Sequence, residues 1–223
     1  MAAFYGLSSV GLGWNGAVRE VSGYDVTANY FDVLGVKPEL GRFFHASDEY
    51  GPDSAPFVVL SDALWRREFH ADPGVVGRTV TLSTHPFNII GVAPPDFHGI
   101  ERFFWPDYFV PMANEEQVEG WDFLHSRLYN PVTVIGRLNP GATVQQATEN
   151  LNAIAAELAR EYPATDREQS ARLIRPGLEG DRRQAIHGFL FSVSALALLP
   201  AASCSATSDR DRTGVAAWRG RRA

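Results

Sequence analysis

Hydrophobic and polar positions alternate over short distances in the first part of the chain. Val18, Val21 and Val26 lie among glycine and polar residues, which predicts short strands joined by turns. Residues 30–36 then predict a brief helical turn. Gly35 predicts its end, because glycine readily adopts the left-handed conformation that follows many helices. We therefore expect both strands and helices from the start of the chain.

A strand and a helix are expected to follow one another directly in the next segment. Residues 57–60 form a short apolar run that predicts a buried strand. Ser61 predicts a helix N-cap, because its hydroxyl can accept a hydrogen bond from the first turn, and the helix should end near Phe69. Further strands are predicted at 78–83, 87–92 and 107–110, the first two as a hairpin.

The second half of the chain carries the strongest helical pattern. Thr143 followed by Gln146 is a capping box, and residues 144–162 place apolar side chains three and four positions apart. An amphipathic helix is therefore predicted there. Strands are predicted at 132–138 and 171–174. This mixture of elements predicts an α/β (α+β) fold.

The two ends of the chain depart from this globular pattern. Residues 188–199 contain no charged residue, but a helix that crosses a bilayer needs about 20 apolar residues. We predict only the start of a truncated transmembrane helix there, and an aberrant or disordered tail at 200–223, as a frameshift or truncation would produce. Residues 1–14 lack a basic region and a clear cleavage site, so they predict no signal peptide.

Composition removes several classes of function. The net charge is −6, and an acidic protein lacks the clustered cations that displace counterions from nucleic acid. Cys204 is the only cysteine, which excludes an internal disulfide and a cysteine-based zinc site. Lys37 is the only lysine and lies outside any Gly-x-x-x-x-Gly-Lys-Ser/Thr motif, which excludes a phosphate-binding P-loop.

Residue patterns typical of catalysis are also missing from the sequence. Ser61 lacks the flanking glycines of a nucleophile elbow, so helix capping accounts for it and no catalytic residue is predicted. No two histidines have the spacing that places both rings on one helical face, so we predict no metal site and no cofactor. The histidines considered as ligands are His45, His70, His85, His98, His125 and His187.

An ordered series of motifs carries a resemblance to a known family. It begins at 21–36 with VSGYDVTANYFDVLGV. The series continues with GRFF at 41–44, VVLS at 58–61, VVGRTV at 75–80, IIGVAP at 89–94 and VIGRLNPGAT at 134–143. Over about residues 15–199 the chain resembles the periplasmic core domain of MacB/FtsX-like ABC-transporter permeases, most of all the duplicated orphan permeases.

The resemblance implies both an architecture and a function. It implies a two-lobed periplasmic core domain over 1–187, with a smaller inserted lobe at about 31–104 and a porter-like lobe made of 1–30 and 105–187. The implied function is that of a non-catalytic extracytoplasmic domain that couples a cytoplasmic ATPase to substrate efflux or mechanotransmission. The implied partners are that ABC ATPase, membrane lipid and a second permease copy. The implied location is the inner membrane, with the domain facing the periplasm.

Two other functions stay open at the level of sequence. A stand-alone extracytoplasmic binding or scaffold module would require a cleavable signal upstream and no membrane span downstream. A metal-assisted hydrolase is disfavoured, because the scattered histidines do not support a ligand geometry.

An aromatic cluster is the one candidate site that the sequence offers. Aromatic side chains bury large areas, so core packing is the simpler interpretation. The alternative is an apolar surface that contacts a partner or an amphipathic substrate. The residues in question are Phe103, Phe104, Trp105, Tyr108 and Phe109.

Overall fold

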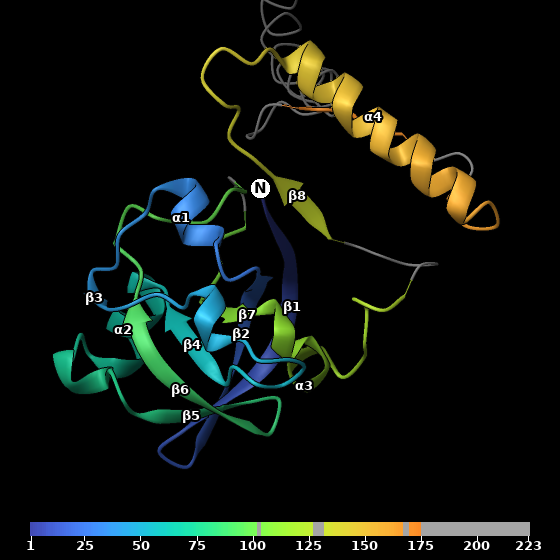
Figure 1. Ribbon diagram of the computed structural model, residues 1–223. Coiled ribbons are helices and arrows are strands. Elements are labelled where there is room, and N and C mark those ends of the chain that lie inside the picture. Colours follow the sequence, from blue (N-terminus) through green and yellow to red (C-terminus); the bar gives the residue numbers. More distant parts are fainter. Residues whose placement is uncertain (102–103, 127–131, 167–169, 175–223) are drawn as a thin grey trace, which may run out of the picture. The chain divides into compact units, whose positions relative to one another are not determined.

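A computed structural model describes residues 1–101, 104–126, 132–166 and 170–174, with only the backbone at residues 7 and 8 (Figure 1). The expected transmembrane start at 188–199 and the tail at 200–223 lie outside the described residues. None of the described helices combines the length and apolar character that a membrane crossing requires. The elements are β1 (Ala2–Trp14), β2 (Ala17–Val26), α1 (Tyr30–Leu34), β3 (Leu40–Gly41), β4 (Phe57–Leu60), α2 (Asp62–Phe69), β5 (Thr79–Leu82), β6 (His85–Val92), β7 (Tyr108–Pro111), α3 (Glu115–Glu119), β8 (Thr133–Ile135) and α4 (Val144–Glu161).

The strands form one mixed, eight-stranded sheet whose pairings close into a ring. Around the ring β1 pairs with β2, β2 with β7, β7 with β4, β4 with β6, β6 with β5, and β5 again with β1. The pairings β2–β7 and β4–β6 are parallel, and the other pairings of the ring are antiparallel. Outside the ring, β8 pairs with β1 and β3 pairs with β6.

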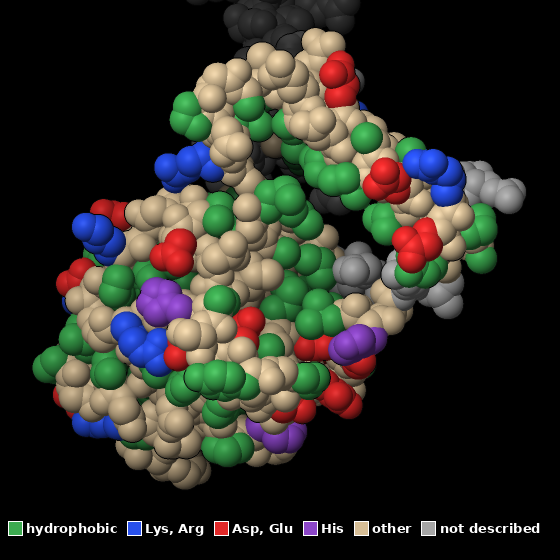
Figure 2. Space-filling model, in the orientation of Figure 1, with side chains coloured by type: hydrophobic (Ala, Val, Ile, Leu, Met, Phe, Trp, Pro, Cys, Tyr) green, Lys and Arg blue, Asp and Glu red, His purple; other side chains and the backbone are tan. Residues whose placement is uncertain are grey.

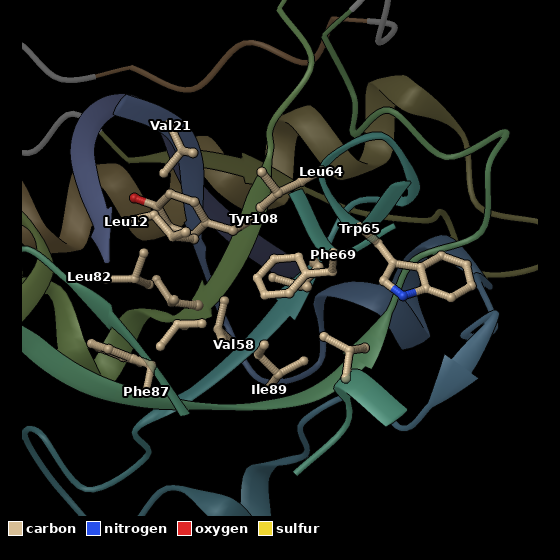
Figure 3. Close-up of a cluster of buried hydrophobic side chains, with 14 of the residues drawn as sticks. Leu12, Val21, Val58, Leu64, Trp65, Phe69, Leu82, Phe87, Ile89 and Tyr108 are labelled. Carbon is tan, nitrogen blue, oxygen red and sulfur yellow. The ribbon is translucent and has the colours of Figure 1, made fainter. Parts of the chain in front are cut away.

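A hydrophobic cluster fills the inside of this ring (Figure 3). Every strand of the ring contributes to the cluster, and α2 adds Leu64, Trp65 and Phe69. Val118 of α3 also belongs to it. Each fully buried aliphatic or aromatic side chain stabilises the fold by about 1.5–3 kcal/mol relative to an exposed one, so the inner cluster contributes substantially to stability.

A second cluster covers the outer face of β1, β2, β4 and β7. Alternation along the strands separates the two clusters, because neighbouring side chains in a strand point to opposite faces. Phe109, for example, lies in the outer cluster, and Tyr108 lies in the inner one. The outer cluster is built largely of aromatic rings from α1 and the segment after β3, such as the stacked pair Phe31 and Phe43, whose centroids are 3.7 Å apart.

Several local predictions are confirmed. Gly35 ends α1 in the left-handed conformation, with a φ of 72°. Ser61 Oγ accepts a hydrogen bond from Leu64 N and caps α2, which ends at Phe69. Thr143 and Gln146 form the predicted capping box at the start of α4. The mixed α/β class is also confirmed.

Four sequence predictions need correction. Residues 171–174 form no strand, and β8 covers only Thr133–Ile135 of the predicted 132–138. The hairpin turn is Ser83–Thr84, both with positive φ, so His85 belongs to β6 rather than to the turn. The start of the chain forms one long hairpin, β1–β2, instead of several short strands.

The proposed division into lobes stays a prediction. Strands β3 to β6 come from the expected inserted lobe at 31–104, and two of them, β4 and β5, pair with strands of the expected porter-like lobe. β4 is hydrogen-bonded to β7, and β5 is hydrogen-bonded to β1. The ring therefore joins both proposed lobes through continuous strand pairing.

Candidate partner-contact surface

The segment that joins β6 to β7 carries the aromatic residues singled out from the sequence. It leaves β6 at Pro94, whose carbonyl accepts a hydrogen bond from Phe97 N at 3.0 Å. The Phe97 ring packs against the outer cluster, with its centroid 5.6 Å from that of Phe109 and 5.8 Å from that of Phe31. The first part of this segment is therefore fixed to the core of the protein.

Phe104 and Trp105 are displayed at the surface of the same segment. Their exposed fractions are 54% and 60%, which is high for large aromatic side chains. The indole of Trp105 stacks on the imidazole of His98, with centroids 3.9 Å apart and planes within 12° of each other. The stacking holds the indole in one orientation.

A buried tyrosine holds the backbone beneath the exposed pair. Tyr24 Oη donates a hydrogen bond to the carbonyl oxygen of Phe104 at 3.3 Å. Burial, together with the negative charge of Glu101, raises the pKa of Tyr24 far above its ordinary value. The hydroxyl therefore stays protonated at every physiological pH, and it has two acceptors, the Phe104 carbonyl and the Glu101 carboxylate.

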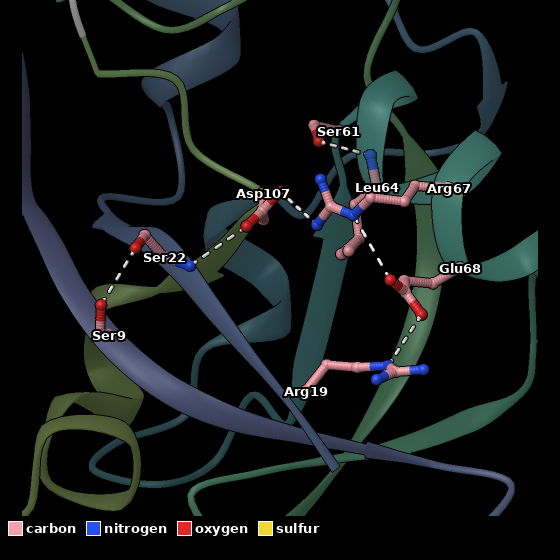
Figure 4. Close-up of polar contacts among 8 residues, drawn as sticks. All are labelled: Ser9, Arg19, Ser22, Ser61, Leu64, Arg67, Glu68 and Asp107. Carbon is pink, nitrogen blue, oxygen red and sulfur yellow. Dashed lines mark hydrogen bonds and ion pairs between the residues drawn. The ribbon is translucent and has the colours of Figure 1, made fainter. Parts of the chain in front are cut away.

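Asp107 fastens the end of the segment to two other elements (Figure 4). Its Oδ2 accepts from Ser22 N of β2 at 3.3 Å, and its own N–H donates to the Ser22 carbonyl at 2.6 Å. Asp107 Oδ1 accepts from Arg67 Nη2 of α2 at 2.9 Å, and the Asp107 carbonyl accepts from Ser61 N at 2.8 Å. Backbone bonds and an ion pair thus join β2, α2 and the start of β7 at one residue.

The ion pair at Asp107 continues as a chain of alternating charges (Figure 4). Arg67 Nε lies 3.4 Å from Glu68 Oε1, and Glu68 Oε2 lies 3.6 Å from Arg19 Nε. The chain runs from the segment before β7, across α2, to β2. Exposed ion pairs of this kind typically contribute only about 0–1 kcal/mol each.

The structure divides the aromatic residues that the sequence grouped together. Tyr108 and Phe109 are fully buried in the two clusters, as core packing predicts, whereas Phe104 and Trp105 are exposed. Phe103 lies outside the described residues. The buried pair could have been separated from the exposed pair by the strand pattern alone, because the apolar run 108–111 is typical of a strand with both faces covered.

The described part of the chain brings three possible metal ligands together. One ligand atom each from Glu115, Asp122 and His125 lies within 4.8 Å of the others. His125 Nδ1 already contacts both carboxylate oxygens of Asp122, at 2.8 and 2.9 Å, and both side chains are substantially exposed. This local ion pair accounts for the grouping. The sequence analysis did not group these residues, because a turn of the chain, and not a regular spacing, places Glu115 beside the other two.

A recess of about 410 Å³ lies beside the β1–β2 turn and the end of α2. Trp14 forms part of its wall. Its two arginines already contact acidic side chains, Arg19 with Glu68 and Arg78 with Asp72. The recess therefore offers no uncompensated charge to a ligand. Over the face shown in Figure 2, acidic and basic side chains are likewise interspersed with hydrophobic ones.

Solved structures with a similar fold include extracytoplasmic parts of ABC-type transporters and a domain of a permease protein. The periplasmic region of MacB from Actinobacillus actinomycetemcomitans gives a TM-score of 0.51 at 20% identity, over 74% of this chain and 68% of that chain. The extracellular domain of the noncanonic ABC-type transporter YknZ from Gram-positive bacteria gives 0.52 at 15% identity, over 76% and 80%. A domain of a putative permease protein from Porphyromonas gingivalis gives 0.51 at 15% identity, over 80% and 79%. At these identities the likeness concerns the fold alone.

The family is shown by the sequence itself. The family model of the MacB-like periplasmic core domain matches residues 2–154, and the chain belongs to this family. It is 25% identical over 139 residues to the macrolide export ATP-binding/permease protein MacB of Aggregatibacter actinomycetemcomitans, across 60% of this chain and 18% of that protein. It is 36% identical over 73 residues to the protein of the same name from Neisseria gonorrhoeae, across 33% and 11%. The chain therefore spans less than a fifth of the length of these relatives.

Proposed function

We propose that this domain is the non-catalytic extracytoplasmic part of an ABC-transporter permease. In this role it couples a cytoplasmic ATPase to substrate efflux or to mechanotransmission across the membrane. Family membership supports the class of protein. The observation that carries the proposal for this chain is the exposed pair Phe104 and Trp105 on a segment braced at both ends.

A domain that transmits movement must not absorb it through local deformation. The segment before β7 meets this requirement, because Tyr24 holds the backbone at Phe104 and Asp107 joins it to both Ser22 and Arg67. A displacement applied at Trp105 would pass to β2 and α2 rather than bend the segment. The braced geometry thus favours a mechanical role over a flexible binding loop.

The exposed aromatic pair is also suited to contact another protein or an amphipathic substrate. Tryptophan is enriched among the residues that dominate binding energy in protein interfaces, because it buries a large area with few rotatable bonds. Trp105 is already held by its stacking on His98, so little side-chain entropy would be lost on contact. We assign Phe104 and Trp105 as the contact surface.

The same proposal places the domain on the periplasmic side of an inner membrane. Its partners would be a cytoplasmic ABC ATPase reached through membrane-embedded parts of the permease, membrane lipid, and a second permease copy. A stand-alone scaffold module would share the contact surface but would have no ATPase to respond to.

The test uses the complete transporter that carries this domain, reconstituted in lipid vesicles with its ATPase. Trp105→Ala should lower the substrate-stimulated ATPase rate several-fold and leave the melting temperature of the domain unchanged. Tyr50→Ala is the matched control, because Tyr50 is an aromatic residue with 85% exposure on another loop. An unchanged stimulated rate in Trp105→Ala, or an equal loss in Tyr50→Ala, would contradict the proposed role of this surface.

A further inference from the structure

The exposed tryptophan ends a short loop whose two ends are in contact with each other. The imidazole of His98 stacks on the indole of Trp105, with centroids 3.9 Å apart. Beside this pair, Gly99 approaches Pro106 so closely that a Cβ on the glycine would lie 3.5 Å from Pro106 Cδ. Residues 98–105, termed the aromatic loop, therefore begin and end at the same place.

The stacking covers one face of the Trp105 indole and leaves the other face to a further group. The planes of the His98 and Trp105 rings lie within 12° of each other, yet 60% of the Trp105 side chain is exposed. The face of an indole carries the negative end of its quadrupole and attracts cations more strongly than the face of a phenyl ring does. A planar guanidinium fits such a face best, because it can stack on it.

The other tryptophans whose ring contacts are known already have a guanidinium nearby. Arg78 lies over the ring of Trp14, 5.7 Å from its centroid, and Arg66 lies over that of Trp65 at 5.6 Å. Trp105 has no such cation among the described residues, although it is far more exposed than Trp65. The open indole face is thus the position where a cation from outside the domain could be accommodated.

Acidic side chains in the same segment favour a cation. Asp96 and Glu101 are exposed and form no ion pair with a described residue, whereas Asp107 is already paired with Arg67 at 2.9 Å. Three peptide units separate Glu101 from His98, so their Cα atoms are at most about 11 Å apart. That distance is comparable with the screening length of about 8 Å at physiological ionic strength.

The net charge of the whole segment has the same sign. Arg102 is the only arginine or lysine in residues 94–107, against three carboxylates, and it lies outside the described residues. Complementary charge selects partners and suppresses wrong ones, so a segment with this balance favours a basic surface over an acidic one.

Resting on the proposed function, we propose that the open face of Trp105 receives the guanidinium of an arginine from another protein component of the transporter, and that Glu101 supplies the attracting charge. Tryptophan and arginine are both enriched among the residues that dominate binding energy in protein interfaces. A protein is favoured over a small molecule as the source of the cation. Small molecules bind in concave sites that enclose most of their surface, whereas Phe104 and Trp105 are displayed.

The test uses the complete transporter with ATP and no added substrate, carrying a photoreactive amino acid at position 104. The yield of the crosslink to another protein component is compared among variants. Trp105→Leu keeps apolar volume without an aromatic face and should lower the yield about three-fold to ten-fold, and Trp105→Phe should lower it less. Glu101→Gln should lower it about two-fold. Arg102→Gln should not lower it, because the guanidinium of Arg102 would compete with the incoming cation.

Asp53→Asn is the matched control, because it removes an exposed carboxyl on the loop of Tyr50, and it should retain the wild-type yield. Mass spectrometry of the crosslinked peptide should place the attachment within a few residues of an arginine. Attachment to a small molecule or to a peptide without arginine, equal yields in Trp105→Leu and the wild type, or a loss in Arg102→Gln instead of Glu101→Gln would overturn this inference and leave the proposed function standing. Absence of any crosslink from position 104 would contradict both.

Discussion

Helices α2 and α4 have similar local signals and opposite surroundings. Each begins with a hydroxyl cap, from Ser61 to Leu64 N at 3.1 Å and from Thr143 to Gln146 N at 3.2 Å. Yet α2 buries Leu64 and two aromatic side chains in the ring, whereas none of the α4 residues is buried. Local sequence thus determines that a helix forms and where it begins. Burial of its apolar stripe depends on a surface supplied from elsewhere.

The largest expected effect is a core truncation in α2. Leu64→Ala should lower the free energy of unfolding by about 2–5 kcal/mol, because it removes buried methyl groups and leaves a cavity inside the ring. Leu158→Ala makes the same chemical change in α4, where the side chain is 39% exposed, and should change stability by less than about 0.5 kcal/mol. Urea unfolding measures both, and equal losses would show that α4 is covered as fully as α2.

The next effect is a pH dependence of stability that is expected for the ring and not for α4. Because the pKa of Asp25 is raised in the folded state, its stabilisation is complete below the unfolded pKa of about 3.9 and is lost as pH rises towards the folded pKa. The free energy of unfolding should fall by up to about 1.4 kcal/mol per pH unit for one proton. Helix α4 buries no carboxyl. After correction for base catalysis, the rate of amide exchange in α4 should therefore not change with pH in the way that the stability of the ring does. Stability that is flat from pH 5 to 8 would contradict the prediction.

A smaller effect is expected at the two helix caps. Ser61→Ala should cost about 0.5–2 kcal/mol of global stability, because α2 unfolds together with the ring. Thr143→Ala removes an equivalent bond, but its effect should appear mainly as faster amide exchange in the first turn of α4. A global loss in Thr143→Ala as large as that in Ser61→Ala would remove the distinction between the two helices.

Sequence was most informative where structure depends on near neighbours. The caps at Ser61 and Thr143 and the end at Gly35 involve residues within a few positions of each other, so their patterns were readable. Strand β1 could not be predicted from the sequence, because it contains several glycines, which are disfavoured in strands. The structure explains them by close approach: a Cβ at Gly6 would lie 2.5 Å from the Tyr24 ring, and one at Gly13 would clash with the Thr81 side chain.

The candidate sites show the same limit. The sequence identified the aromatic segment, and the strand pattern at 107–110 could have set Tyr108 and Phe109 apart as buried. No local signal predicted that Phe104 and Trp105 are exposed, because their exposure depends on what the ring and α1 cover. The burial of Asp25 was not predicted either, because what encloses its side chain lies far from it in the sequence.

Photo-crosslinking in the assembled transporter tests the central claim most directly. A photoreactive amino acid is placed at position 105, and in a matched sample at position 50, and the complete transporter is irradiated with and without ATP. The account predicts a crosslink from position 105 to another transporter component or to substrate, with a yield that changes with nucleotide, and none from position 50. Absence of a crosslink at position 105, or equal yields at both positions regardless of ATP, would contradict it.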